Sequence, residues 1–117
     1  MISNNFYITT PIYYPSGDPH IGHAYSSIFA DVFARFKRND NCKVFFLTGT
    51  DEHGLKIQKS AEKRKLDPLT YCNEISKTFR DLSKQLNLSN DDFIRTTEER
   101  HKKSVNVLWN RLVESGD

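Results

Sequence analysis

The chain has 117 residues, of which 37% are apolar, 27% charged and 12% aromatic, the composition of an ordinary globular protein. This length allows one domain with a modest core and excludes a multidomain protein. The formal net charge of +2 is too small to indicate nucleic-acid binding by itself. Cys42 and Cys72 lack metal-ligand spacing and are too few for a disulfide framework, so we expect a reducing, cytoplasmic location.

The sequence shows neither a secretory signal nor a segment that could span a membrane. Residues 1–5 lack a basic segment followed by an apolar one, which a secretory signal requires. The longest continuous apolar run, residues 44–47, is far too short to cross a bilayer. We therefore expect a soluble protein with no membrane partner.

The first half of the chain predicts a strand, a helix and a second strand. Residues 6–10 are aromatic and β-branched and end at Pro11, as in a short strand. A turn rich in proline and glycine follows, and an amphipathic helix begins at His20 and ends near residues 38–41. Its apolar positions are Ile21, Ala24, Tyr25, Ile28, Phe29, Val32, Phe33 and Phe36. Residues 43–50 predict a fully buried parallel strand.

The second half predicts three helices and one more strand. Residues 55–65 predict a helix with a basic outer face, which is more typical of a solvated surface than of a nucleic-acid contact. Asp67 then caps a helix whose first residue is Pro68. Its apolar stripe is Cys72, Ile75, Phe79, Leu82 and Leu86. Residues 93–97 predict a third strand, and a helix starts at residue 98. We expect its apolar residues to point inward: Val105, Leu108, Trp109 and Leu112.

The two polar loops of the first half should meet at one place. Strand, helix, strand is a right-handed unit with parallel strands, and open α/β sheets bind ligands at the carboxyl ends of such strands. The loop before His20 and the loop after Thr50 both follow a strand, so both should open at this edge.

The stretch from His20 to His23 has the features of an anion site. Unpaired N–H groups and the positive end of the helix dipole attract anions to a helix start. The two histidines are three residues apart and share a helix face, and Gly22 between them allows close approach of a ring or a phosphate. This pattern is typical of a nucleoside triphosphate site.

These residues resemble the His-Ile-Gly-His signature of the class I aminoacyl-tRNA synthetases. Residues 8–14, Ile-Thr-Thr-Pro-Ile-Tyr-Tyr, and residues 46–54, Phe-Leu-Thr-Gly-Thr-Asp-Glu-His-Gly, narrow the resemblance to the methionyl-tRNA synthetases, and it extends through residues 93–97. The resemblance implies an α/β fold with a Rossmann-like parallel sheet and flanking helices. It also implies a ligase that activates methionine with ATP and transfers it to tRNA(Met).

The resemblance also implies roles for individual residues. His20 and His23 would be catalytic, and together with Gly22 they would bind ATP, which enters with Mg²⁺ as a substrate. Asp51 would bind the ammonium group of methionine. Pro11, Ile12 and Tyr14 would bind its side chain, whereas we expect Tyr13 to pack in the core. No bound metal is expected in this segment.

Several alternatives stay open. His20, His23, His53 and Asp51 could form a zinc cluster, and Asp51 could instead cap the following helix. The residues 14–17 also resemble leucyl-tRNA synthetases, and nucleotidylyltransferases share the His-x-Gly-His pattern.

The resemblance implies that residues 1–117 are the first half of a catalytic domain. We find no Lys-Met-Ser-Lys-Ser loop, no insertion for the tRNA acceptor end and no anticodon-binding helices. The partners would be methionine, ATP, tRNA(Met) and the missing carboxyl-terminal portion. A fragment that binds ATP or methionine without turnover is an alternative.

Overall fold

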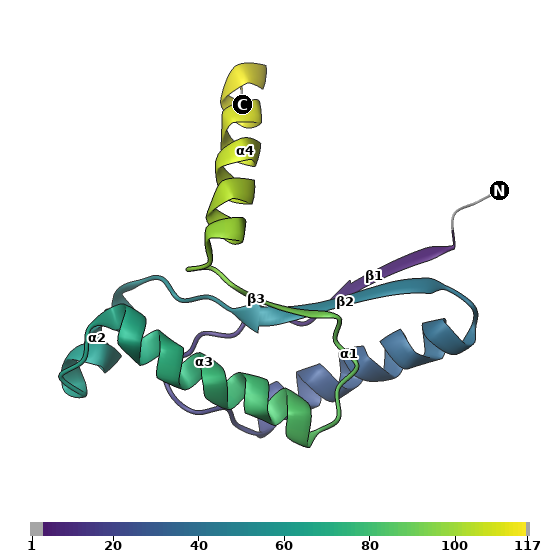
Figure 1. Cartoon of the computed structure of the whole chain (residues 1–117), viewed down its shortest axis with the longest axis horizontal. Helices are drawn as coiled ribbons and strands as arrows, with labels where there is room; N and C mark the ends of the chain where they lie inside the picture. Colours follow the sequence, from purple (N-terminus) through teal and green to yellow (C-terminus); the bar gives the residue numbers. More distant parts are fainter. Residues whose placement is uncertain (1–3, 117) are drawn as a thin grey trace.

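Three parallel strands form a sheet in the order β1 (Asn5–Thr9), β2 (Lys43–Thr50), β3 (Asp92–Arg95) in the computed structural model of the chain (Figure 1). The structure describes residues 4–116. Its extents are 54 × 44 × 19 Å, so it is a thin slab. Figure 1 is viewed along the shortest of these axes, so the sheet and the helices lie beside one another across the two longer ones.

Three helices cover the same face of the sheet (Figure 1). Helix α1 (Ile21–Asn39) joins β1 to β2, and α2 (Leu55–Lys63) and α3 (Pro68–Gln85) join β2 to β3. Parallel neighbours joined in sequence require such crossovers, and crossovers of one hand place their helices on one side. The predicted α/β class with a parallel sheet and flanking helices is confirmed.

Strand β2 has the predicted bounds, but the prediction that it is fully buried is wrong. Phe46 faces the helices and has no exposed area, whereas the side chain of Phe45 points to the other face and is 47% exposed. On that face Phe45 stacks on Tyr7 of β1, with ring centroids 6.0 Å apart. Alternate residues of a strand point to opposite faces, so a sheet covered on one side buries only half of them.

Helix α1 packs on the sheet through its small residues. The face toward the sheet carries Ala24, Ser27, Ala30, Asp31 and Ala34. The large apolar residues of the predicted stripe lie on the exposed face instead: Ile21, Tyr25, Ile28, Phe29, Val32, Phe33 and Phe36. Alanine lets the helix axis approach the strands closely, and the Asp31 carboxylate accepts hydrogen bonds from the backbone N and the hydroxyl of Ser89, both 2.6 Å long. The periodicity predicted the helix correctly but not the side that it buries.

Helix α3 supplies much of the main core. The Asp67 carboxylate caps it by accepting from the Thr70 N–H at 3.0 Å, with Pro68 in the first turn, as predicted. Cys72, Ile75 and Phe79 are buried as expected. They form one cluster with residues of α2, of β3 and of the loop after β1: Tyr13, Ile57, Ala61, Tyr71 and Phe93.

Helix α4 (Glu99–Ser115) projects from the opposite side of the sheet, and the prediction that its apolar residues point inward is wrong (Figure 1). None of its described residues is buried, and Trp109 is 66% exposed. Its first turn is attached through Arg100, which pairs with Asp92 of β3. The spacing of Val105, Leu108, Trp109 and Leu112 predicts an apolar stripe, yet the rest of the described chain contributes no surface opposite it.

Smaller differences concern element ends. Helix α2 ends at Lys63 because Lys65 takes a left-handed conformation with φ of 57°. Strand β3 covers residues 92–95 and not 93–97. Within residues 4–116, no helix combines the length and the apolar character needed to cross a membrane.

Candidate active site

The loop after β1 lies against the end of β2. The Tyr13 N–H donates to the Gly49 carbonyl at 3.1 Å, and the Asp51 N–H donates to the Tyr13 carbonyl at 2.8 Å. The Thr10 and Thr48 hydroxyls also form a hydrogen bond, 2.7 Å long. The two loops that the sequence predicted at one sheet edge therefore do meet there.

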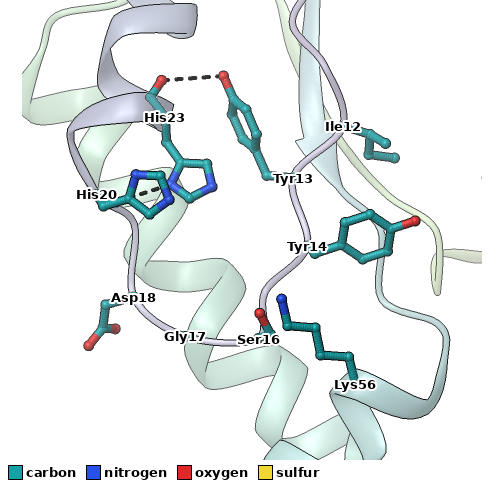
Figure 2. Close-up of a pocket in the computed structure, with 9 residues that line it drawn as sticks. All are labelled: Ile12, Tyr13, Tyr14, Ser16, Gly17, Asp18, His20, His23 and Lys56. Atoms are coloured by element: carbon teal, nitrogen blue, oxygen red, sulfur yellow. Dashed lines mark hydrogen bonds between the residues drawn. The ribbon is translucent and has the colours of Figure 1, made fainter.

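His20 and His23 cap the first turn of α1 with their own rings. Nδ1 of His20 accepts from the Gly22 N–H at 3.1 Å. Nδ1 of His23 accepts from the His20 N–H at 3.0 Å (Figure 2). The ring centroids are 3.9 Å apart. A ring nitrogen that accepts a hydrogen bond carries no proton, so each neutral imidazole has its proton on Nε2. The capping bonds thus leave two Nε2–H donors for a ligand.

Gly22 makes room for the His20 ring. A Cβ atom at Gly22 would lie 2.9 Å from Cε1 and 3.1 Å from Nδ1 of His20. Any side chain would therefore push the imidazole out of its capping position. This steric role differs from the predicted one, close approach of a ligand, and Gly22 is not among the residues that line the cleft.

His23 is half-buried against two aromatic rings. Its ring makes edge contacts with Tyr13 at 4.9 Å and with Phe79 at 5.0 Å between centroids. Burial, and secondarily the nearby His20, lower the pKa of His23 below its ordinary value. His23 is therefore held neutral near pH 7, in the form that the capping bond requires.

Tyr13 attaches the helix start to the core, as predicted. Its hydroxyl forms a 3.0 Å hydrogen bond with the Ser27 hydroxyl and donates to the His23 carbonyl at 3.3 Å. Its ring stacks on Phe79 at 5.7 Å. The position of His23 therefore depends on Phe79, a core residue of α3.

An open cleft of about 410 Å³ lies in front of the histidines (Figure 2). Its lining includes four of the predicted site residues: Ile12, Tyr14, His20 and His23. It also includes residues that sequence reasoning did not assign to the site: Ser16, Gly17, Asp18 and Lys56. Predicted residues Pro11, Gly22 and Asp51 lie outside the lining.

Lys56 is the most consequential of the missed residues. The sequence predicts a basic, solvated outer face for residues 55–65, but the Lys56 side chain extends toward Ser16 and Tyr14 (Figure 2). The signal in the sequence was its place in the first turn of α2, directly after the 46–54 stretch. It adds a cation to the cleft.

Asp51 follows β2 and borders the cleft through Tyr14. Its carboxylate accepts from the His53 N–H and from the Thr96 hydroxyl, both at 3.3 Å. A hydrogen bond to this carboxylate and its negative charge raise the pKa of Tyr14 above its ordinary value. The helix-capping alternative for Asp51 is wrong, because Gly54 is the N-cap of α2 and adopts a φ of 110° there.

Glu52 is a buried carboxylate that sequence reasoning did not single out. It accepts from Arg95 Nε at 2.7 Å and from the Thr50 hydroxyl at 2.8 Å, and its other oxygen accepts from Thr97. Its side chain is completely buried. Only the tertiary fold brings Arg95 to it, since the two are far apart in sequence.

The zinc alternative needs His20, His23, His53 and Asp51 to converge. Within the described range 4–116, no three histidine, cysteine or acidic side chains are grouped as metal ligands. The His53 ring is directed instead to the Thr96 carbonyl, 3.3 Å away.

Comparison with known proteins identifies the family. The family model described as tRNA synthetases class I (M) matches residues 6–117. The chain belongs to the class I tRNA synthetases. A methionine–tRNA ligase of Rickettsia bellii is 53% identical over 115 residues, which are 98% of this chain and 23% of the relative. One of Listeria monocytogenes is 55% identical over 114 residues, 97% of this chain and 17% of the relative.

Solved structures of the synthetase family agree with the fold. The crystal structure of Mycobacterium tuberculosis methionyl-tRNA synthetase bound by methionyl-adenylate superposes with a TM-score of 0.94 at 44% identity. It covers 97% of this chain and 22% of the other. This synthetase chain thus spans less than a quarter of the length of these relatives. The family predicted from residues 20–23 and 46–54 is confirmed, and the roles of single residues remain predictions.

Proposed function

We propose that this chain forms part of the active site of a methionine–tRNA ligase. Such an enzyme activates methionine with ATP to methionyl-adenylate and transfers the methionyl group to tRNA(Met). The main structural support is the pair of imidazoles at the start of α1, whose capping bonds leave both Nε2–H groups free for a ligand beside the cleft. Membership of the family and the likeness to a synthetase bound by methionyl-adenylate support the choice of substrates.

The histidines would act on the phosphates of ATP. In the activation step a methionine carboxylate oxygen bonds to the α-phosphorus, the bond from that phosphorus to the bridging oxygen breaks, and pyrophosphate leaves. Negative charge grows on the phosphate oxygens, and two preorganised N–H donors at a helix N-terminus stabilise it. Because the capping bonds hold both rings before ATP arrives, little reorganisation is needed.

Methionine would bind beside Tyr14, on the side of the cleft away from the histidines. In Figure 2, Ile12 and Tyr14 lie across the cleft from the histidines. The Asp51 carboxylate would pair with the substrate ammonium group, a charge-assisted contact that orients the carboxylate for attack. Ile12, Tyr14 and the adjacent exposed Pro11 would contact the thioether side chain, which offers shape and little polarity for recognition.

The remaining parts of the reaction would require sequence outside this chain. We expect the Lys-Met-Ser-Lys-Ser loop, the acceptor-end insertion and the anticodon-binding helices of the family to belong to a longer protein. ATP would enter with Mg²⁺, and the enzyme would act in the cytoplasm.

Methionine-dependent exchange of pyrophosphate into ATP tests the proposal directly. We expect exchange by the chain to depend on methionine and to fall about 100-fold in His23→Ala, because one preorganised transition-state donor is lost. The matched control is His101→Ala on α4, outside the cleft, which should keep the exchange rate. Exchange that is unaffected by His23→Ala would contradict the role of this histidine.

The second candidate function is a fragment that binds ATP or methionine without turnover. The exposure of the cleft favours this candidate, since its lining residues Ile12 and Tyr14 are 44% and 54% exposed. Amide NMR spectra recorded with ATP, and with ATP plus methionine, separate the cases. Ligand-dependent shifts at Gly22, His23 and Asp51 without any exchange activity would indicate binding alone.

A further inference from the structure

The two carboxylates that follow β2 lie in very different surroundings. Asp51 is half-buried beside the cleft, whereas the Glu52 side chain has no exposed area. Successive residues of an extended chain point to opposite sides, so fixing one side chain also fixes the direction of its neighbour.

Three donors hold the Glu52 carboxylate. Arg95 Nε donates to Oε1 at 2.7 Å, and the hydroxyls of Thr50 and Thr97 donate to Oε1 and Oε2. Arg95 is itself fixed, because its Nη2 donates to the Asn73 side-chain oxygen of α3 at 2.7 Å and its side chain is only 17% exposed. The ion pair therefore joins the ends of β2 and β3 to helix α3.

Thr96 connects this ion pair to Asp51. Its hydroxyl oxygen accepts from the Glu52 N–H at 2.8 Å and donates to Oδ1 of Asp51 at 3.3 Å. The Thr96 hydroxyl thus bridges Asp51 and Glu52. Residues 95–97 are fixed because Arg95 and Thr97 both donate hydrogen bonds to the Glu52 carboxylate. Displacing residues 95–97 would thus displace a hydrogen-bond donor of the Asp51 carboxylate.

We propose that Glu52 and Arg95 are positioning residues that direct the Asp51 carboxylate to the methionine ammonium group. The choice of methionine as the ligand rests on the proposed function, whereas the orientation of Asp51 by the ion pair does not. A buried ion pair adds little net stability compared with apolar residues, while removal of one partner is strongly destabilising. The presence of this ion pair next to Asp51 therefore agrees with a role in orientation.

Two variants separate positioning from stability. Arg95→Met leaves a buried, unpaired carboxylate and should lower the melting temperature. The double variant Glu52→Gln with Arg95→Met removes the unpaired charge and should recover most of this loss. Arg100→Met is the matched control, because Arg100 pairs with Asp92 at the other end of β3.

The first readout needs no ligand. Asp51 raises the pKa of Tyr14, so titration of that hydroxyl, followed by NMR of ¹³C-labelled tyrosine, reports the distance to the carboxylate. Asp51→Asn sets the reference for complete loss of the effect. We expect the double variant to move the Tyr14 pKa down toward this reference, and Arg100→Met to leave it unchanged.

The second readout is ligand affinity by NMR titration of the chain. The double variant should bind methionine about tenfold more weakly, the cost of one weakened charge-assisted contact, and should bind ATP as before. A folded double variant with unaltered Tyr14 pKa and unaltered methionine affinity would overturn the proposal. If the unsubstituted chain binds no methionine, the proposed function fails for this chain, and the Tyr14 titration still decides whether the ion pair positions Asp51.

Discussion

Replacing Tyr13 by phenylalanine removes a single oxygen atom from the contact between α1 and the core. That oxygen lies 3.0 Å from the Ser27 hydroxyl and donates to the His23 carbonyl at 3.3 Å. Both Tyr13 and Ser27 are buried, so the Ser27 hydroxyl would lose its partner without gaining water. An unsatisfied buried polar group costs about 1–3 kcal/mol, which lowers the melting temperature by roughly 4–12 °C in a chain of this size.

A double-mutant cycle tests the reasoning more sharply than either change alone. Ser27→Ala should also cost about 1 kcal/mol, but the Tyr13→Phe and Ser27→Ala double variant leaves no unpaired hydroxyl at the contact. We therefore expect the double variant to cost clearly less than the sum of the single variants.

Urea unfolding, with identical slopes for all variants, measures these differences. The control is Tyr25→Phe, since Tyr25 lies on the exposed face of α1 and its change should stay within about 0.5 kcal/mol. Strict additivity of the two core changes would refute the assigned hydrogen bond.

Three further predictions concern pH, backbone packing and thiol chemistry. Because the pKa of His23 is lower in the folded chain than in the unfolded one, unfolding binds protons. Stability should therefore decrease as the pH falls below about 6.5, and His23→Gln should flatten this decrease in unfolding measured by circular dichroism. A Cβ atom at Gly49 would lie 1.9 Å from a carbonyl oxygen of β3, so Gly49→Ala should abolish cooperative melting, whereas Gly17→Ala, with no neighbour within 4 Å, should not. Burial, and next the charge of Glu52, raise the pKa of Cys72 to about 11, so thiol reagents at pH 8 should modify Cys42 first, as mass spectrometry of partly labelled protein would reveal.

Local sequence determined the elements of this chain and the meeting of its two loops. The segment predicted as a strand, Lys43 to Thr50, has the bounds of β2, and Asp67 with Pro68 marks the start of α3. These features depend on neighbouring residues, which is why periodicity and capping chemistry predict them. The parallel order of strands follows from the crossover rule, and it was enough to bring residues 11–23 beside Asp51.

Tertiary structure alone decided which faces are buried and which distant groups pair. Helix α1 has an aromatic stripe that fits a core, yet the sheet accepts the alanine face, since close approach needs small side chains and Asp31 reaches its partner Ser89 only in this orientation. The pairing of Glu52 with Arg95, and the position of Lys56 in the cleft, join elements that local patterns treat separately. Periodicity in the sequence predicts which residues share a face of a helix, whereas the surface against which that face packs depends on the whole fold.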